Sequence, residues 1–299
     1  MRYALDVQYI GKNYAGSKIQ FENGREIKEP TVQGEIEKAL STLIIGKKRC
    51  EDRKDFEKSK VFEDETLQDR RYDRNGSEGN EAISDCTGGF SKYNDRRIKT
   101  IFSGRTDKGV NALGQVLHFD TYKDIVASNF IYHINEILPS DISVNNLRVV
   151  SPLFHAQKSA KARYYRYELI NIRYKQAFDG DILRVKYNLD VERMQNALNF
   201  LLGEHDFSSF KSSGTLNPSK VCFISRANVE KLGDRVFIHI EGNRFLYNMV
   251  RTIVGTLLEI EGHKLPVEHM KEVLEAHDRR KAGQTVSPYG LTLMRVDYP

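Results

Sequence analysis

The sequence SGRTDKGVNALGQVLHF, residues Ser103–Phe119, carries the strongest signal in this chain. It places one carboxylate, Asp107, between an arginine two positions before it and a glycine two positions after it. The run Val116–Phe119 is typical of a buried strand. We therefore expect a chemically exposed Asp in a tight, glycine-flanked loop. Because Asp and Gly are ordinary turn residues, the alternative is that Arg105 and Asp107 only brace a turn.

The length, composition and charge of the chain limit the classes of protein to which it can belong. The 299 residues suffice for one large core or two modest domains. A hydrophobic fraction of 39% and a charged fraction of 29% predict that some segment is solvated rather than packed. The net charge of +5 and the isoelectric point near 8.9 are compatible with an acidic partner such as RNA.

The cysteines and the apolar runs indicate the cellular environment of the protein. Cys50, Cys86 and Cys222 lack the spacing of a metal site or of a disulfide framework, which favours a reduced, intracellular environment. No apolar run is long enough to cross a bilayer, and the chain enters an alternating strand pattern at once. We expect a soluble, untargeted, cytoplasmic protein without a metal and without membrane association.

Periodicity predicts an α+β protein. Residues 3–9, 161–169 and 236–241 alternate with the period of a strand. Apolar residues recur at helical spacing in four places: after a cap at Thr31, after a cap at Ser128 with an end at Pro139, from about Asp190, and in the stretch 242–255 that contains Arg251. A strand followed by an amphipathic helix occurs twice, which predicts two similar halves, residues 1–150 and 151–299, that face each other.

Residues 47–97 interrupt this pattern. They contain 13 basic and 13 acidic residues, and their apolar residues have no period. Such a segment buries too little apolar surface to offset the entropy lost on ordering it. We expect an inserted, largely disordered surface loop. The alternative, an arm that grips RNA, is disfavoured by its zero net charge.

The loop around Asp107 resembles a known signature. Gly104-Arg105-Thr106-Asp107-x-Gly109-Val110, followed by Gly114-Gln115-Val116, is similar to the motif of the tRNA pseudouridine synthases of the TruA type. Departures from the family pattern stand at Ser17, Lys108, Asn111 and Gln157. The resemblance extends over nearly the whole chain outside 47–97, and segments that carry it are 9–20, 31–35, 135–142, 154–156, 203–210 and 282–298.

The resemblance implies a fold and an activity. The fold would be that of the pseudouridine synthases, with mixed, mainly antiparallel sheets, flanking helices and an active-site cleft between the two halves. Asp107 would be the nucleophile that isomerises uridine to pseudouridine at positions 38, 39 and 40 of the tRNA anticodon arm, in a homodimer. The reaction has no redox change and donates no group, so we expect no cofactor.

The resemblance also implies roles for residues around Asp107. Arg251 would pair with Asp107 and keep it ionised, although a helical arginine can instead reach solvent. Tyr165 would stack on the uracil and help to take the C5 proton, the alternative being a core aromatic of a strand. Arg105 would take the place that the extruded base leaves in the stack, or hold a phosphate. Leu291 would line the pocket. Candidate contacts to the RNA backbone are Arg2, Lys161, Arg163 and Arg166.

A second hypothesis keeps the scaffold without the reaction. A non-catalytic tRNA-binding or RNA-folding protein would fit the basic charge and the departures from the family pattern. The intact set of Arg105, Asp107, Tyr165 and Arg251 favours the enzyme. Substitution of Asp107 separates the two hypotheses, because only catalysis requires its carboxylate.

Overall fold

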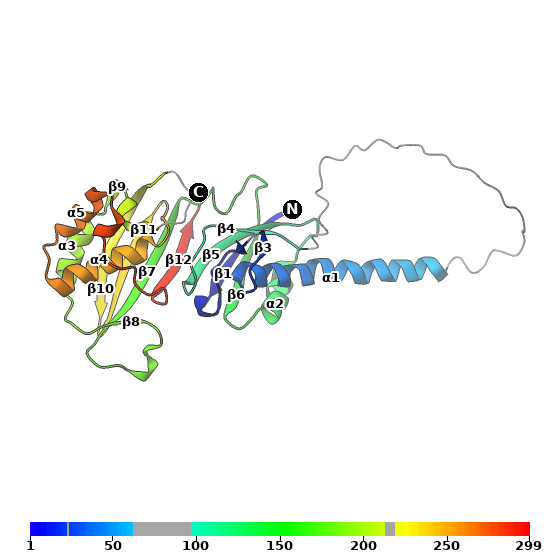
Figure 1. The fold of residues 1–299 in the computed structure, drawn as a ribbon. Helices are drawn as coiled ribbons and strands as arrows, with labels where there is room; N and C mark the ends of the chain where they lie inside the picture. The colour runs from blue at the N-terminus through cyan, green and yellow to red at the C-terminus, as the bar shows by residue number, and fades with distance from the viewer. Residues whose placement is uncertain (23, 62–96, 213–218) are drawn as a thin grey trace, which may run out of the picture.

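The computed structural model describes residues 1–22, 24–61, 97–212 and 219–299 (Figure 1). Within these ranges the chain forms a ten-stranded sheet, a two-stranded hairpin and five α-helices, which confirms the α+β class. The helices are α1 Val32–Val61, α2 Ala127–Ile137, α3 Val191–Asn199, α4 Met249–His263 and α5 His269–Ala276. The strands are β1 Arg2–Tyr9, β2 Phe21–Glu22, β3 Arg25–Glu26, β4 Thr100–Phe102, β5 Asn111–Asp120, β6 Ile142–Val150, β7 Ala162–Asn171, β8 Leu183–Val185, β9 Gly203–Asp206, β10 Val221–Leu232, β11 Arg235–Gly242 and β12 Leu291–Asp297.

The last strand of the chain joins the two parts of the large sheet. The strand order is β6-β1-β5-β12-β7-β11-β10-β9, with β4 paired to β5 and β8 paired to β7. All of these pairs are antiparallel except β12 with β5 and β7 with β8, so the expected mixed, mainly antiparallel sheet is confirmed. In Figure 1, β12 lies in red between the two lobes. The division of the chain at residue 150 stays a prediction.

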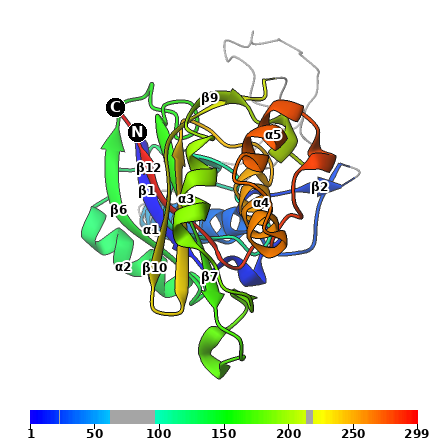
Figure 2. The same cartoon turned by 90° about the vertical axis from the view of Figure 1, so that its left-hand side faces the viewer.

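Two apolar clusters fill the two lobes. One packs β1 and β5 against α1 and α2, and the other packs β7, β10 and β11 against α3, α4 and α5. Figure 2 shows α3, α4 and α5 gathered over the second lobe. On β12, Leu291 belongs to the second cluster and Leu293 to the first, while Tyr165 of β7 packs against both. The seam between the clusters therefore runs along β12.

Three of the predicted helix starts can be compared with the structure. Thr31 Oγ1 accepts a hydrogen bond from the amide of Gly34 (3.1 Å), so the cap predicted at Thr31 is confirmed. The helix start predicted near Asp190 is confirmed too, and the Asp190 carboxylate caps it by accepting from the amides of residues 192 and 193. The cap predicted at Ser128 is wrong, because α2 already begins at Ala127 and has no side-chain cap. A tertiary contact holds its start instead, since the amide of Ile125 donates to the hydroxyl of Tyr3 (3.1 Å).

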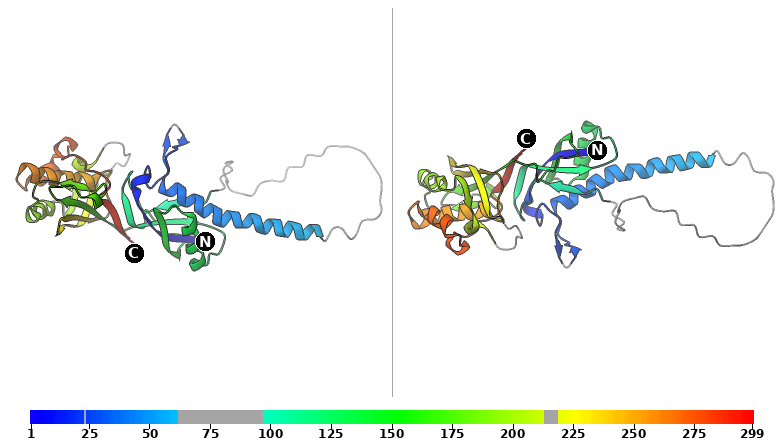
Figure 3. Two further views of the ribbon diagram at one scale, coloured as in Figure 1. Left: turned by 90° about the horizontal axis from the view of Figure 1, so that it is seen from below. Right: turned by 90° about the horizontal axis from the view of Figure 1, so that it is seen from above.

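Helix α1 continues into the stretch that was expected to be disordered from Lys47. It ends only at Val61 and projects beyond the body of the molecule, as Figure 3 shows. Lys, Arg and Glu are frequent in 47–61 and have high intrinsic helix propensity, so a helix anchored at its start can continue there without an apolar face. The rest of the predicted insertion up to residue 96 lies outside the described residues.

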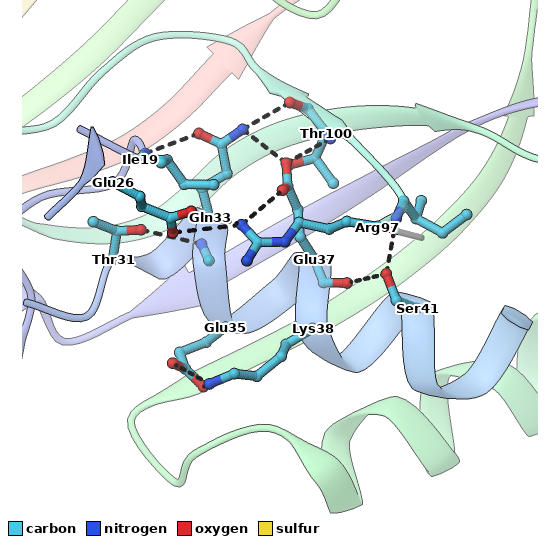
Figure 4. Close-up of polar contacts among 12 residues, drawn as sticks. Ile19, Glu26, Thr31, Gln33, Glu35, Glu37, Lys38, Ser41, Arg97 and Thr100 are labelled. Carbon is cyan, nitrogen blue, oxygen red and sulfur yellow. Dashed lines mark hydrogen bonds and ion pairs between the residues drawn. The ribbon is translucent and has the colours of Figure 1, made fainter. Parts of the chain in front are cut away.

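A buried carboxylate ties α1 to β4. Glu37 Oε1 accepts hydrogen bonds from the amide (2.8 Å) and the hydroxyl (3.0 Å) of Thr100 and from Gln33 Nε2 (2.9 Å), as Figure 4 shows. Burial raises the pKa of Glu37, whereas these hydrogen bonds and the charge of Arg97 lower it. Ser41 on the next turn accepts from the amide of Ile98 (2.8 Å). The start of β4 is therefore fixed against the part of α1 that packs on the sheet.

Candidate active site

The loop between β4 and β5 places Asp107 at the seam between the lobes. The amide of Val110 donates to the carbonyl of Asp107 (3.1 Å), which closes a tight turn. Gly109 has a φ of +83°, and a Cβ there would lie 2.8 Å from Pro288 Cγ, so only glycine fits this backbone and this approach. The sequence pattern around Asp107 thus follows from the geometry of the turn.

A buried polar network holds this loop from behind. The Ser17 hydroxyl accepts from the amide of Thr106 (2.8 Å), and the Thr106 hydroxyl bonds to the Tyr9 hydroxyl (2.7 Å). Gln115 donates to the carbonyl of Gly104 (3.1 Å) and accepts from the hydroxyl of residue 103. Fully hydrogen-bonded buried networks rigidify the groups they join.

Sequence reasoning missed this network. Ser17 was noted only as a departure from the family pattern, yet it is fully buried and holds Thr106 in place. The available signal was the polar side chain of Gln115 next to the apolar run of β5, since a buried polar group needs partners.

Asp107 lines a cleft of about 340 Å³ along the seam. Arg105, Tyr165, Arg251 and Leu291 line the same cleft, so the structure brings together the residues that the resemblance placed around Asp107. They come from the β4–β5 loop, from β7, from α4 and from the start of β12. Their roles stay predictions.

Opposing effects set the charge of Asp107. Burial raises the pKa of its carboxyl group, and the positive charges of Arg105 and Arg251 lower it. No N–O contact within 4.0 Å joins Asp107 and Arg251 among the described residues. Arg251 Nε instead donates to the carbonyl of Val286 (2.8 Å), and Nη1 donates to Asn248 Oδ1 (2.7 Å). Arg251 therefore acts on Asp107 through its field rather than through a direct ion pair in this structure.

Tyr165 packs against an aromatic neighbour in the cleft. Its ring packs edge-on against Phe245, with centroids 5.1 Å apart and an interplanar angle of 81°. Burial is the main cause that raises the pKa of Tyr165 well above its ordinary value, and the charge of Asp107 adds to it. The phenol is therefore neutral near pH 7. It can donate a hydrogen bond, but it is a weak base for taking a proton.

Arg163 has a structural place in the cleft wall. Its two terminal nitrogens donate to four carbonyl oxygens, those of residues 160 (3.2 Å), 243 (2.6 Å), 103 (3.0 Å) and 157 (2.9 Å). Burial lowers the pKa of Arg163 from its ordinary value. Because its terminal donors are engaged, the geometry favours bracing of the cleft over contact with a phosphate.

The other candidate contacts to an RNA backbone lie outside the cleft. Arg2 forms a bidentate pair with Asp120 (2.7 and 2.8 Å), a bond that raises the pKa of Arg2. The guanidinium carbon of Arg166 lies 5.1 Å from the centroid of the Phe237 ring. Lys161 is exposed at the start of β7. These residues are not brought together with Asp107, and their contacts to RNA stay predictions.

The segment before α4 adds residues that sequence reasoning did not single out. A helix was expected within 242–255, but α4 begins only at Met249. Residues 244–248 therefore form a loop, and all of them line the cleft. Arg244 and Tyr247 bring polar groups to its wall, and Asn248 holds Arg251.

The described parts of the chain contain neither a metal-binding cluster nor a membrane-spanning helix. No cluster of three or more His, Cys, Asp or Glu side chains there is arranged to hold a metal ion. No helix within those parts combines the length and the apolar character that crossing a membrane requires.

Comparisons with known proteins agree with one another. A family described as tRNA pseudouridine synthase matches residues 197–299. The tRNA pseudouridine synthase A of Brevibacillus brevis is 43% identical over 203 residues, 67% of this chain and 83% of that protein. The tRNA pseudouridine synthase A of Colwellia psychrerythraea is 34% identical over 300 residues, 100% of this chain and 94% of that protein. That of Pseudomonas aeruginosa is 41% identical over 211 residues, 70% of this chain and 74% of that protein.

A solved structure gives a weaker similarity. A chain of a Cbf5-Nop10-Gar1 complex matches 66% of this chain and 40% of its own length, at 11% identity and a TM-score of 0.30. This similarity is too low to carry an argument.

Proposed function

This chain belongs to the tRNA pseudouridine synthase A family, and from that premise we propose that it isomerises uridines 38, 39 and 40 of the tRNA anticodon arm with Asp107 as nucleophile. As a pseudouridine synthase it is an isomerase. The proposal concerns which uridines react and which side chain attacks. The observation that carries it is the position of Asp107, which a buried network holds at a cleft lined by Arg251 and Tyr165.

The reaction exchanges one bond for another at the ribose. The bond from C1′ to N1 of uracil breaks, the base turns, and C5 bonds to C1′; C5 loses a proton and N1 gains one. A carboxylate can form the covalent intermediate at either the sugar or the base ring. Asp107 must be ionised for this attack. The charges of Arg105 and Arg251 favour that state against the effect of burial.

The cleft fits a base that has left its stack. A uridine in a paired arm must be extruded before its ring can react. Tyr165, Phe245 and Leu291 line the cleft with apolar surface, and the exposed Arg105 lies at its edge. We expect the extruded uracil to pack against Tyr165, with Arg105 on the RNA that stays outside. The hydroxyl of Tyr165 is neutral and would hydrogen-bond to the base.

Three further features belong to the same proposal. We propose that the protein acts as a homodimer, that it works in the cytoplasm, and that it needs no cofactor. The chemistry supports the last point, because the isomerisation is redox-neutral and no group is donated.

Release of tritium from tRNA labelled at uridine C5 tests the proposal, because bonding through C5 expels that hydrogen. We expect release by the wild type and none by Asp107→Asn, which keeps the size of the side chain but cannot attack. Asp124→Asn is the matched control, since Asp124 is exposed and lies away from the cleft. Transcripts in which uridines 38, 39 or 40 are replaced singly then locate the reaction.

The outcomes separate enzyme from binding protein. Full activity of Asp107→Asn would refute the nucleophile, and release that persists without uridines 38–40 would refute the site. A wild type that binds several tRNAs and releases no tritium from any of them would leave the non-catalytic RNA-binding protein.

A further inference from the structure

Asn248 has an unusual backbone conformation beside the cleft. It stands directly before α4, and its backbone has a φ of 62° and a ψ of 7°. These angles lie in the left-handed region, which residues other than glycine rarely adopt. Two of the other described non-glycine residues with positive φ, Lys264 and His277, end helices, where this conformation is common. Asn248 begins one. Backbone strain of this kind persists only where the surroundings impose it.

The side chain of Asn248 does not cap the helix. An asparagine at this position ordinarily accepts a hydrogen bond from an amide of the first turn. Here Asn248 makes no such bond; its Oδ1 accepts from Arg251 Nη1 (2.7 Å), and its Nδ2 donates to the hydroxyl of Ser212 (3.1 Å). With the bond from Arg251 Nε to the carbonyl of Val286 (2.8 Å), this fixes the guanidinium at two of its three nitrogens.

We propose that Asn248 is a positioning residue, whose left-handed backbone and side-chain oxygen hold Arg251 where its charge acts on Asp107. The inference rests on the proposed function. No N–O contact within 4.0 Å joins Arg251 to Asp107 in the described structure, so the strength of the effect of Arg251 depends on where its neighbours hold it. Asn248 is the side chain that bonds to its terminal nitrogen.

Other groups around Asp107 do not depend on Asn248. Arg105 belongs to the same loop as Asp107, and its charge acts on the carboxylate directly. From β7, Tyr165 is a neutral phenol, and Arg163 donates to carbonyl groups. Arg244 lines the same cleft. A variant at Asn248 therefore changes the contribution of Arg251 and leaves these groups in place.

Asn248→Gly tests the proposal, because glycine accepts the left-handed backbone and removes only the side chain. We expect kcat to fall between about 10-fold and 100-fold with little change of KM for tRNA, since misplacement of a catalytic group by about 1 Å has effects of this size. We also expect the acid limb of the pH profile of kcat/KM to move up by about one pH unit, because Asp107 loses part of the field that keeps it ionised.

Asn146→Gly is the matched control. Asn146 also has a positive φ of 50°, and its amide donates to the carboxylate of Asp6 (2.8 Å), which pairs with Arg148. Asn146 lies on β6, at the edge of the large sheet, and none of these residues lines the cleft. Wild-type kcat and an unmoved acid limb are expected. Asn248→Asp adds a third test, because its carboxylate would keep the bond to Arg251 while drawing that charge away from Asp107, so the acid limb should again move up.

A titration of the Asp107 carboxyl carbon by NMR gives a readout that needs no activity. We expect its pKa to be higher in Asn248→Gly than in the wild type and unchanged in Asn146→Gly. Equal pKa values in the wild type and Asn248→Gly would overturn the positioning role, whether or not the protein proves to be a synthase. Absence of tritium release by the wild type, with the pKa raised as expected in Asn248→Gly, would instead overturn the proposed function alone.

Discussion

Replacement of Gly255 by alanine is expected to damage both stability and catalysis, because α4 and the loop after α5 cross there at backbone distance. A Cβ on Gly255 would lie 1.7 Å from the carbonyl oxygen of Gln284, whereas ordinary van der Waals contact begins at 3.4 Å. One of the two elements must therefore move by about 1.7 Å. A Cβ on Gly283 would likewise lie 2.7 Å from the carbonyl carbon and oxygen of Gly255, so both glycines belong to one close approach of the two backbones.

This movement would break hydrogen bonds between α4 and the loop after α5, one of which is made by Arg251 of the cleft. The amide of Gly283 donates to the Thr256 hydroxyl (3.0 Å), and Arg251 Nε donates to the carbonyl of Val286 (2.8 Å). Overpacking costs about 1 to 3 kcal/mol, and each lost hydrogen bond costs about 1 kcal/mol. The higher helix propensity of alanine raises the free energy of unfolding by about 1 kcal/mol. We expect a net loss of about 2 to 4 kcal/mol in the free energy of unfolding.

Urea unfolding measures the loss of stability, and tritium release measures the effect on Arg251. We expect Gly255→Ala to lower kcat about 100-fold at temperatures where it is still folded. Gly46→Ala on α1 is the control, because a Cβ there meets no atom within 4 Å and should stabilise the protein by up to about 1 kcal/mol. Wild-type stability and activity of Gly255→Ala would refute the reasoning from the backbone crossing.

Two further predictions follow from the loop that carries Asp107. Burial raises the pKa of Asp107 above its ordinary 3.8, so wild-type stability falls as the pH rises from 3.8 through the raised pKa. The stability of Asp107→Asn relative to the wild type should therefore grow across this window in urea unfolding at a series of pH values; a decrease would contradict the role of burial. Ser17→Ala leaves the buried amide of Thr106 without its side-chain acceptor and should lower the free energy of unfolding by about 1 to 3 kcal/mol, whereas an unchanged urea midpoint would show that the bond contributes nothing.

Local signals in the sequence predicted much of the fold. The strands β1, β7 and β11, the cap at Thr31 and the helix start near Asp190 were predictable, because alternation, capping and helical spacing depend on residues a few positions apart. A prediction from the sequence failed where a contact from a distant part of the chain took the place of a local one. The Ser128 cap failed for this reason, since Tyr3 holds the chain before α2.

The candidate site also contains residues that local sequence identified and residues whose contacts only the structure shows. Asp107 was identifiable because its whole motif lies in one tight turn, whose glycine the backbone requires. Arg163 and Arg2 were predicted as candidate contacts to the RNA backbone, and the structure shows them bonded to groups 60 and 118 positions away in the chain. A pattern of residues does not reveal which distant carbonyl or carboxylate a side chain will meet.

The sequence by itself determined much of the secondary structure, the candidate carboxylate Asp107 and the family, because these follow from the spacing of nearby residues or from similarity along the whole chain. The tertiary structure alone decided that β12 joins the two lobes, that Ser17 holds the loop of Asp107, and that Asn248 bonds to Arg251 without capping its helix. These facts depend on how chain segments far apart in sequence pack together. Tertiary packing sets the distances between the charged side chains of the candidate site.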